Sequence, residues 1–287
     1  MNYTITPLTE HQTGAEVRGL DLRHPIDAPL RKALNDAFAQ YHVLVFRDQK
    51  LTPAEFSRAG ELFGDIMPQS HKRSRTHEGL EVYDIKNEQT EPGKYLITGE
   101  TFHTDHSHYP HPPKATALHA VSLPSKGGDT QFVNMHRAYD DLPEDTKRRI
   151  GGLQAKHVFL SKYSPRDLRS VDEKTRSALP PAVTHPLVRT HPQNGRKFLY
   201  LNPVRIESIT GMPDPEAIAL IGELMTHATR IRFEYRHRWQ YGDMVIWDNR
   251  SVMHQANGDY DMKEVRHLYR LMIKELEVRD LPLAAAG

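Results

Sequence analysis

The apolar residues of this chain come in short runs that have the length of a β-strand. Val43–Phe46 and Met244–Trp247 are examples, and no run approaches the roughly 20 apolar residues of a membrane-spanning helix. Helical patterns separate some of these runs, but strands and helices do not alternate along the whole chain. Such alternation is typical of a doubly wound parallel sheet. The pattern therefore favours a mainly β fold with helical insertions, either a double-sheet barrel or a jelly roll.

Helical periodicity and capping signals predict several helices. In 30–41 the apolar residues recur every three or four positions, which places them on one helical face. Thr52, followed by Pro53 and Glu55, is a typical N-cap with a capping box. Further helices are predicted over Met135–Gly151, Ser164–Leu179 and Asp214–Thr229, the last capped by Asp214. Strands are predicted at 3–8, 43–46, 80–86, 114–121, 129–133, 233–238, 243–247 and 266–274, with a hairpin that joins 183–190 to 197–201.

The segment 67–101 is polar and loop-like apart from the strand predicted at 80–86. Long ordered loops in compact domains are often lids or binding loops. We therefore expect 67–101 to act as a lid over an active site. The sequence contains no internal repeat and no low-complexity tract, so residues 1–287 are predicted to form a single domain.

The composition narrows the choice of partners and of metal chemistry. Lys and Arg number 38 against 37 Asp and Glu, a net charge of +1 that gives no reason to expect nucleic-acid binding. The opening MNYTITPLTE lacks the basic and apolar regions of a secretory signal, so we expect a cytoplasmic protein. The absence of Cys excludes disulfides, thiolate metal sites and cysteine nucleophiles. With 18 His in the chain, imidazole and carboxylate remain as metal ligands.

A metal site is predicted from three residues. His103 and Asp105 lie two positions apart in an extended segment, so both side chains point to the same side. This triplet alone is weak evidence, since solvated His residues in a polar loop would look the same. His254 follows a buried strand and a turn, where a jelly roll can place a third ligand. Two His and one carboxylate form the facial triad, which leaves three positions open on Fe(II). A structural zinc site is less well supported, because such sites usually use Cys.

Two arginines are candidates for binding anions at the open positions. Arg266 and Arg270 are four apart on a predicted strand, so both should face the same side. Guanidinium groups pair with carboxylates through two parallel hydrogen bonds. The alternatives are two surface arginines on an edge strand, or a structural Arg270 that pairs with Asp259 or Glu264.

Together these residues resemble the family of taurine and dichlorophenoxyacetate dioxygenases, which use Fe(II) and 2-oxoglutarate. The resemblance covers nearly the whole chain and includes the segments at 14–22, 43–49 and 185–202. It implies a double-stranded β-helix, a cupin-like jelly roll, with helical insertions and one catalytic dioxygenase domain. The motifs that carry it are H-T-D at 103–105, G-G-D-T at 127–130, W-D-N-R-x-x-x-H at 247–254 and R-x-x-x-R at 266–270.

The resemblance also implies a role for each matching residue. The iron ligands would be His103, Asp105 and His254. Thr130 and Arg266 would hold the far carboxylate of 2-oxoglutarate. Arg270 would bind the acidic group of the primary substrate, with Phe102, Phe159, Gln69 and His71 as further pocket residues. Gln69 stands where the taurine enzyme has a His, and Phe102 where it has a Trp, which weakens an assignment to taurine. His106, His108 and His111 are interpreted as loop or rim residues.

The implied reaction hydroxylates a small organic acid, such as an aryloxyalkanoate or a taurine-like alkylsulfonate, with O₂ as second cosubstrate. Succinate and CO₂ are released from 2-oxoglutarate. The expected partner is a small anionic substrate, with no nucleic acid and no membrane, and we expect a homo-oligomer. Two other hypotheses remain open. A mononuclear zinc hydrolase on a cupin-like barrel leaves Thr130, Arg266 and Arg270 unexplained, and a non-catalytic small-acid binding protein would not require an intact triad.

Overall fold

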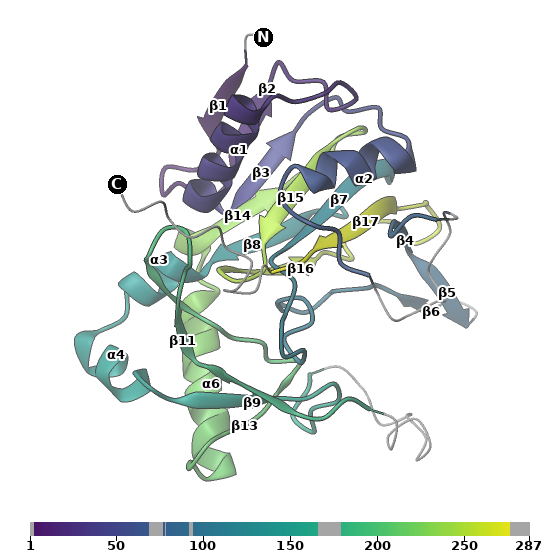
Figure 1. The fold of residues 1–287 in the computed structure, drawn as a ribbon. Helices are drawn as coiled ribbons and strands as arrows, with labels where there is room; N and C mark the ends of the chain where they lie inside the picture. Colours follow the sequence, from purple (N-terminus) through teal and green to yellow (C-terminus); the bar gives the residue numbers. More distant parts are fainter. Residues whose placement is uncertain (1–2, 69–76, 78, 92–93, 166–178, 276–287) are drawn as a thin grey trace, which may run out of the picture.

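Two β-sheets packed face to face form the centre of the protein (Figure 1). The computed structural model describes residues 3–68, 77, 79–91, 94–165 and 179–275. The larger sheet has seven strands in the order β1 (Thr4–Pro7), β2 (Ala15–Arg18), β3 (Val43–Phe46), β15 (Met244–Asp248), β7 (Ala115–Ser122), β17 (His267–Ile273) and β4 (Tyr83–Lys86). The smaller sheet has the order β14 (Glu234–His237), β8 (Thr130–Asn134) and β16 (Val252–Ala256). This is the predicted jelly roll with helical insertions.

The short apolar runs are central strands that are buried on both faces. Along β3, Val43 and Val45 point toward the smaller sheet, whereas Leu44 and Phe46 point to the outer face. Their neighbour β15 alternates in the same way, with Trp247 inside. Because side chains alternate along a strand, a strand covered on both sides needs a continuous apolar run.

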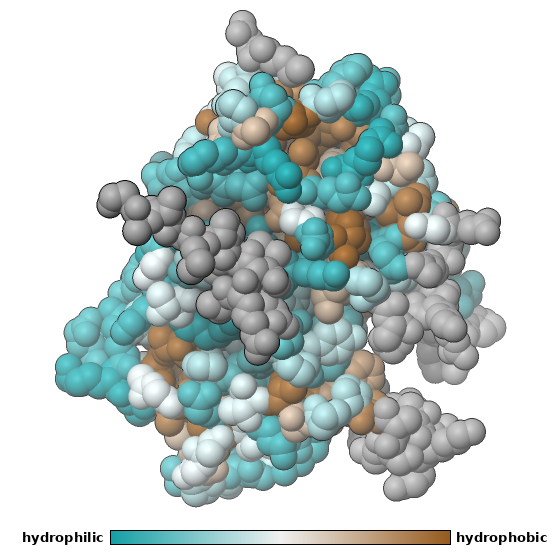
Figure 2. All heavy atoms as spheres, in the orientation of Figure 1, coloured by the Kyte–Doolittle hydropathy of each residue, from teal (hydrophilic) through white to brown (hydrophobic). Residues whose placement is uncertain are grey.

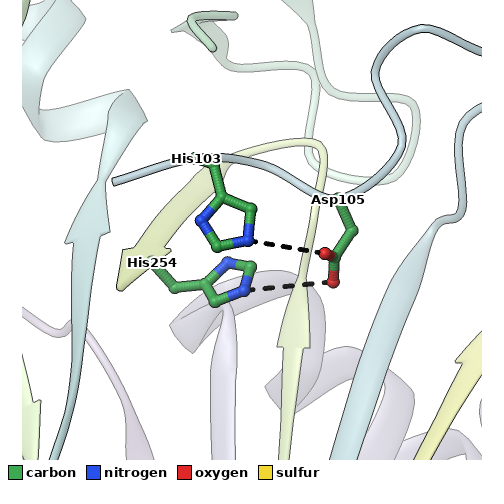
Figure 3. A group of neighbouring side chains, drawn as sticks. All are labelled: His103, Asp105 and His254. Atoms are coloured by element: carbon green, nitrogen blue, oxygen red, sulfur yellow. Dashed lines mark ion pairs between the residues drawn. The ribbon is translucent and has the colours of Figure 1, made fainter. Parts of the chain in front are cut away.

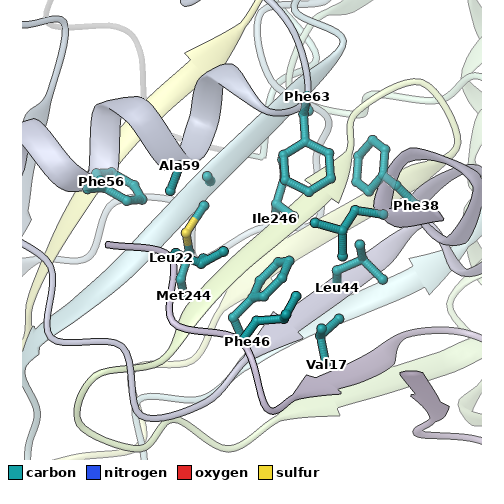
Figure 4. Close-up of a cluster of buried hydrophobic side chains, with 14 of the residues drawn as sticks. Val17, Leu22, Phe38, Leu44, Phe46, Phe56, Ala59, Phe63, Met244 and Ile246 are labelled. Carbon is teal, nitrogen blue, oxygen red and sulfur yellow. The ribbon is translucent and has the colours of Figure 1, made fainter. Parts of the chain in front are cut away.

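Two helices cover the outer face of the larger sheet (Figure 4). They are α1 (Ala28–Tyr41), whose buried face carries Leu34 and Phe38, and α2 (Pro53–Glu61). The predicted capping box of α2 is present, since Thr52 and Glu55 bond to each other's backbone N–H groups. Phe38, Phe56 and Phe63 pack there with Phe46 and Met244.

A long insertion between β8 and β14 forms the lower part of the molecule in Figure 1. Its own core contains Phe198, Leu220 and Leu224. The α6 helix (Asp214–Ala228) packs beside a small sheet of β10 (Val183–Pro186), β9 (Gln154–His157) and β13 (Ile206–Ile209). The remaining elements are α3 (Met135–Asp140), α4 (Glu144–Ile150), β11 (Val188–Thr190), β12 (Lys197–Leu199) and a 3₁₀ turn at Ile231–Phe233.

Several predicted elements differ from the structure. The helix predicted over Met135–Gly151 is two helices, because Pro143 lacks an N–H and stands at the N-cap position immediately before α4. Asp214 is not a cap: Pro213 precedes α6, and the Asp214 carboxylate bonds to a Lys and a Tyr instead. The predicted hairpin pairs only β11 with β12, while β10 pairs with β9. Part of the 67–101 loop forms a hairpin of β5 (Glu88–Glu91) and β6 (Lys94–Leu96). The helix predicted at Ser164–Leu179 falls largely outside the described residues.

The face of the protein shown in Figure 2 is mainly hydrophilic, and its hydrophobic side chains lie in small separate groups. Among the residues that the structure describes, no helix combines the length and the apolar character that a membrane span requires.

Candidate active site

Three side chains that could hold a metal converge at one end of the smaller sheet (Figure 3). His254 follows β15 and the turn after it, as predicted, and lies within β16, a strand that was not predicted. His103 joins it through a two-residue bridge, in which each backbone N–H donates to the other's carbonyl at 3.0 and 2.8 Å. Asp105 Oδ1 lies 3.7 Å from His103 Nε2, and Asp105 Oδ2 lies 3.9 Å from His254 Nε2. One ligand atom from each residue lies within 4.8 Å of the other two.

The hydrogen bonds of His103 suit a metal ligand. Its Nδ1 lies 2.7 Å from the carbonyl oxygen of Thr101, which can only accept a hydrogen bond. Nδ1 therefore carries a proton, and Nε2 is the ring nitrogen that faces Asp105. A ring nitrogen that donates to a carbonyl is the usual way in which proteins fix the tautomer of a ligating His. The donor set fits a divalent transition metal.

The Asp105 carboxylate is ionised despite its position. Burial opposes its charge, but His254, His103 and Arg270 outweigh this effect and hold the pKa of Asp105 below its usual range. An ionised carboxylate beside two imidazoles is the state that binds a cation.

The sequence D-N-R forms the tight turn that brings β16 back beside the site. Asp248 and Arg250 are both buried, and Arg250 donates two hydrogen bonds to the carboxylate at 2.8 and 2.6 Å. His191 lies 2.9 Å from the same carboxylate. This pairing lowers the pKa of Asp248 against the effect of burial. These polar residues of the motif are therefore structural, and they fix where His254 lies.

A buried cation lies in the same pocket as the triad. Arg266 is only 6% exposed and lines the pocket with Thr130. In the described part of the chain no carboxylate forms an ion pair with it: its Nε donates to the carbonyl of Gly128 at 2.9 Å, and its Nη2 lies 3.5 Å from Thr130 Oγ1. Burial lowers the pKa of Arg266. Burying a guanidinium without a counter-ion is costly, which makes Arg266 a candidate for binding an anion.

Gly128, from the G-G-D-T motif, and Trp239, which the sequence did not reveal, hold Arg266 and the Thr130 hydroxyl in place. Gly128 has φ +72°, and a Cβ there would lie 3.1 Å from Cδ of Arg266. Trp239 donates its indole N–H to Thr130 Oγ1 at 3.0 Å. A hydroxyl has two acceptor sites and one donor. Since Trp239 and Arg266 both approach as donors, the O–H of Thr130 is left to donate into the pocket.

Arg270 lies on β17 and lines the pocket together with the apolar side chains of Ile85, Leu118 and Trp247. The prediction that Arg266 and Arg270 face the same side is confirmed, since both line this pocket. Asp259 and Glu264, the carboxylates considered as structural partners of Arg270, bond elsewhere. Asp259 accepts from Arg236 and from the N–H of Gly128, and Glu264 accepts from Ser125.

Other predicted pocket residues lie elsewhere. Phe102 packs against the core of the insertion, and Phe159 packs against His108 and beneath the guanidinium of Arg205. Neither lines the pocket that holds the triad. Gln69 and His71 lie outside the described residues. His106, His108 and His111 are not part of the metal cluster or of the pocket wall.

Comparison with known proteins identifies the same family as the sequence motifs do. The profile described as "Taurine catabolism dioxygenase TauD, TfdA family" matches residues 4–272. An alpha-ketoglutarate-dependent 2,4-dichlorophenoxyacetate dioxygenase of Burkholderia sp. (strain RASC) is 36% identical over 269 residues, covering 89% of each chain. The (S)-phenoxypropionate/alpha-ketoglutarate-dioxygenase of Sphingobium herbicidovorans is 31% identical, covering 94% of each chain. The crystal structure of AAD-2 in complex with Mn(II) and N-oxalylglycine superposes with a TM-score of 0.84 at 31% identity, covering 96% of this chain and 99% of the other. This chain belongs to the TauD/TfdA family and is a 2-oxoglutarate-dependent dioxygenase.

Proposed function

We propose that the enzyme holds Fe(II) with His103, Asp105 and His254, and binds the far carboxylate of 2-oxoglutarate with Arg266 and Thr130. One observation carries this proposal: the triad lines a single pocket with a buried guanidinium that has no carboxylate partner among the described residues. A keto acid with two carboxylates matches both features, since one end can chelate a metal and the other can pair with Arg266.

The chain itself supplies orientation and charge. Bound iron would supply the redox chemistry that couples oxidation of 2-oxoglutarate to succinate and CO₂ with hydroxylation of a substrate C–H bond. Arg266 and the Thr130 hydroxyl would fix one end of the cosubstrate. The aliphatic side chains of Ile85 and Leu118 exclude water beside it.

The primary substrate of this proposal is a small organic anion, with aryloxyalkanoates first among the candidates. Arg270 supplies the second cation of the pocket, and Trp247, Ile85 and Leu118 provide an apolar surface next to it. A cation beside apolar walls suits an acid with a hydrophobic body. The relative from Burkholderia acts on 2,4-dichlorophenoxyacetate, which is such an acid. Contacts of the substrate with Phe102, Phe159, Gln69 and His71 stay predictions.

The test is succinate formation by protein loaded anaerobically with Fe(II) and then supplied with 2-oxoglutarate and air. The panel contains aryloxyalkanoates, alkylsulfonates including taurine, and other small acids, each beside its neutral amide. Succinate should form fastest with an aryloxyalkanoate, and the amides should fail. Equal stimulation by an acid and its amide would contradict the anion requirement. A zinc-loaded protein that hydrolyses esters and makes no succinate would favour the hydrolase alternative, which leaves Arg266 without a role.

A further inference from the structure

A continuous chain of hydrogen bonds links the wall of the pocket to the carboxylate of the metal cluster. The indole N–H of Trp247 donates to Asn249 Oδ1 at 2.9 Å, and Asn249 Nδ2 donates to Thr116 Oγ1 at 2.8 Å. The hydroxyl of Thr116 then donates to Asp105 Oδ2 at 2.6 Å. Trp247, Asn249 and Thr116 are each at most 2% exposed, so water does not compete for these bonds.

The direction of this chain follows from its first member. An indole N–H can only donate, so the Asn249 atom facing Trp247 must be the carbonyl oxygen. The amide nitrogen therefore faces Thr116 and donates to it. Since Thr116 already accepts this bond, its own proton is directed to Asp105. The direction of all three hydrogen bonds is thus fixed, and Asp105 Oδ2 accepts from the Thr116 hydroxyl.

Asn249 itself is held by the backbone on both sides. Its N–H donates to the carbonyl of Lys114 at 2.9 Å, and its carbonyl accepts from the hydroxyl of Thr104 at 2.5 Å. Thr104 lies between the two predicted ligands His103 and Asp105. The turn at 248–250 and the segment 103–105 are therefore tied together through Asn249, and the amide cannot rotate without breaking several buried bonds.

We infer that Thr116, Asn249 and Trp247 are positioning residues that fix the orientation of the Asp105 carboxylate for metal binding. Both carboxylate oxygens face the imidazoles (Figure 3). The hydrogen bond from Thr116 to Oδ2 opposes rotation of the carboxylate, and so it also fixes where Oδ1 lies. This inference rests on the proposed metal site.

The test compares metal affinity among matched threonine variants. Metal-free wild-type, Thr116→Val and Thr116→Ser proteins are titrated with Mn(II) by calorimetry. Thr116→Val removes the donor with little change in shape and should weaken Mn(II) binding by about 10–100-fold, the usual cost of losing an outer-shell partner. Thr116→Ser restores the hydroxyl and should recover most of the affinity.

The control is Thr13→Val. Thr13 is also fully buried, and its hydroxyl also accepts from an asparagine amide, Asn134 Nδ2, at 3.0 Å, but it is not part of the site. Its loss should lower the melting temperature of the metal-free protein and leave Mn(II) affinity unchanged. Wild-type Mn(II) affinity in Thr116→Val, or an equal loss in Thr13→Val, would overturn the inference.

A second variant covers the case in which Thr116→Val does not fold. Asn249→Leu keeps the Thr116 hydroxyl but removes the donor that directs it, so Mn(II) affinity should fall by a smaller factor, about threefold to tenfold. Unchanged affinity there would also count against the inference. His254→Ala separates the two proposals: if it binds Mn(II) as tightly as the wild type, the metal site itself is wrong, whereas normal binding in the Thr116 and Asn249 variants alone removes only the positioning role.

Discussion

Gly128 lies so close to the side chain of Arg266 that a Cβ there would meet it, and Arg266 Nε donates to the carbonyl of the same glycine at 2.9 Å. The second glycine of G-G-D-T therefore has two reasons to be glycine. Its φ of +72° disfavours any other residue, and a Cβ would approach Cδ of Arg266 to 3.1 Å. A motif that looks like a simple turn in the sequence sets the position of the buried cation.

Gly128→Ala should weaken 2-oxoglutarate binding through this contact. The backbone strain should also cost roughly 1–2 kcal/mol of stability. Gly211→Ala is the matched control, because Gly211 has φ +75° and nothing within 4 Å of an added Cβ. Both variants should lose stability, but only Gly128→Ala should show a raised dissociation constant for 2-oxoglutarate in calorimetry of the Mn(II) protein. Equal affinities in the two variants would contradict the role of the contact.

Arg266→Lys should raise the KM for 2-oxoglutarate strongly and change the KM for the primary substrate little. An ammonium is a point charge and cannot reproduce the two parallel bonds of a guanidinium. The loss of one partner of a buried charge pair costs roughly 2–5 kcal/mol. Steady-state succinate assays with each substrate varied in turn separate the two constants. If only the primary-substrate KM moved, the roles of Arg266 and Arg270 would have to be exchanged.

Arg270→Ala should separate cosubstrate oxidation from substrate oxidation. The slow decarboxylation of 2-oxoglutarate that needs no primary substrate should persist, because Arg266, Thr130 and the triad are intact. Stimulation by the primary substrate should fall by orders of magnitude. The measurement is CO₂ release with and without substrate. Full stimulation in the variant would show that Arg270 does not bind the acid group.

A cluster of buried histidines should make stability depend on pH. Burial lowers the pKa of His136 to about 4, and Arg196 and His191 act in the same direction. Burial also holds the pKa of His42 well below its usual range, and the His42 ring centroid lies 4.6 Å from that of His136. Near pH 5 an unfolded His binds a proton that folded His136 does not, so stability falls as pH drops from about 6.5 toward 4.

His136→Gln should reduce this dependence. Between pH 7 and pH 5 the difference in unfolding free energy should shrink by roughly 2 kcal/mol relative to wild type. Urea unfolding of the metal-free protein at both pH values measures it. His111→Gln, at an exposed His, is the control and should keep the wild-type dependence. An unaltered dependence in His136→Gln would mean that His136 is not the group that titrates.

Features that depend on residues close together in the sequence could be predicted, and contacts between residues far apart in the sequence could not. The apolar face of α1, the capping box at Thr52 and the same-side pair His103 and Asp105 each depend on residues within a few positions. The break at Pro143 was also local, and the proline itself was the signal that the single predicted helix ignored.

The supporting residues could not be found in this way. Trp239 bonds Thr130 across 109 positions, and Asn249 bonds Thr116 across 133. No periodicity marks such partners, because they are set by which strands become neighbours. The strand that contains His254 was not predicted, because β16 is short and partly polar and only its pairing with β8 makes it a strand. The spacing of the residues and the resemblance predicted the three ligands, and the structure shows which residues orient them.

The most direct measurement is iron content and turnover of His254→Ala beside wild type, each loaded anaerobically with Fe(II), desalted and assayed for succinate. The triad predicts one tightly bound iron per chain and turnover in the wild type, with both lost in the variant while its circular dichroism shows an intact fold. A folded His254→Ala protein that retains stoichiometric iron and wild-type succinate formation would contradict the assignment of His103, Asp105 and His254 as the metal site.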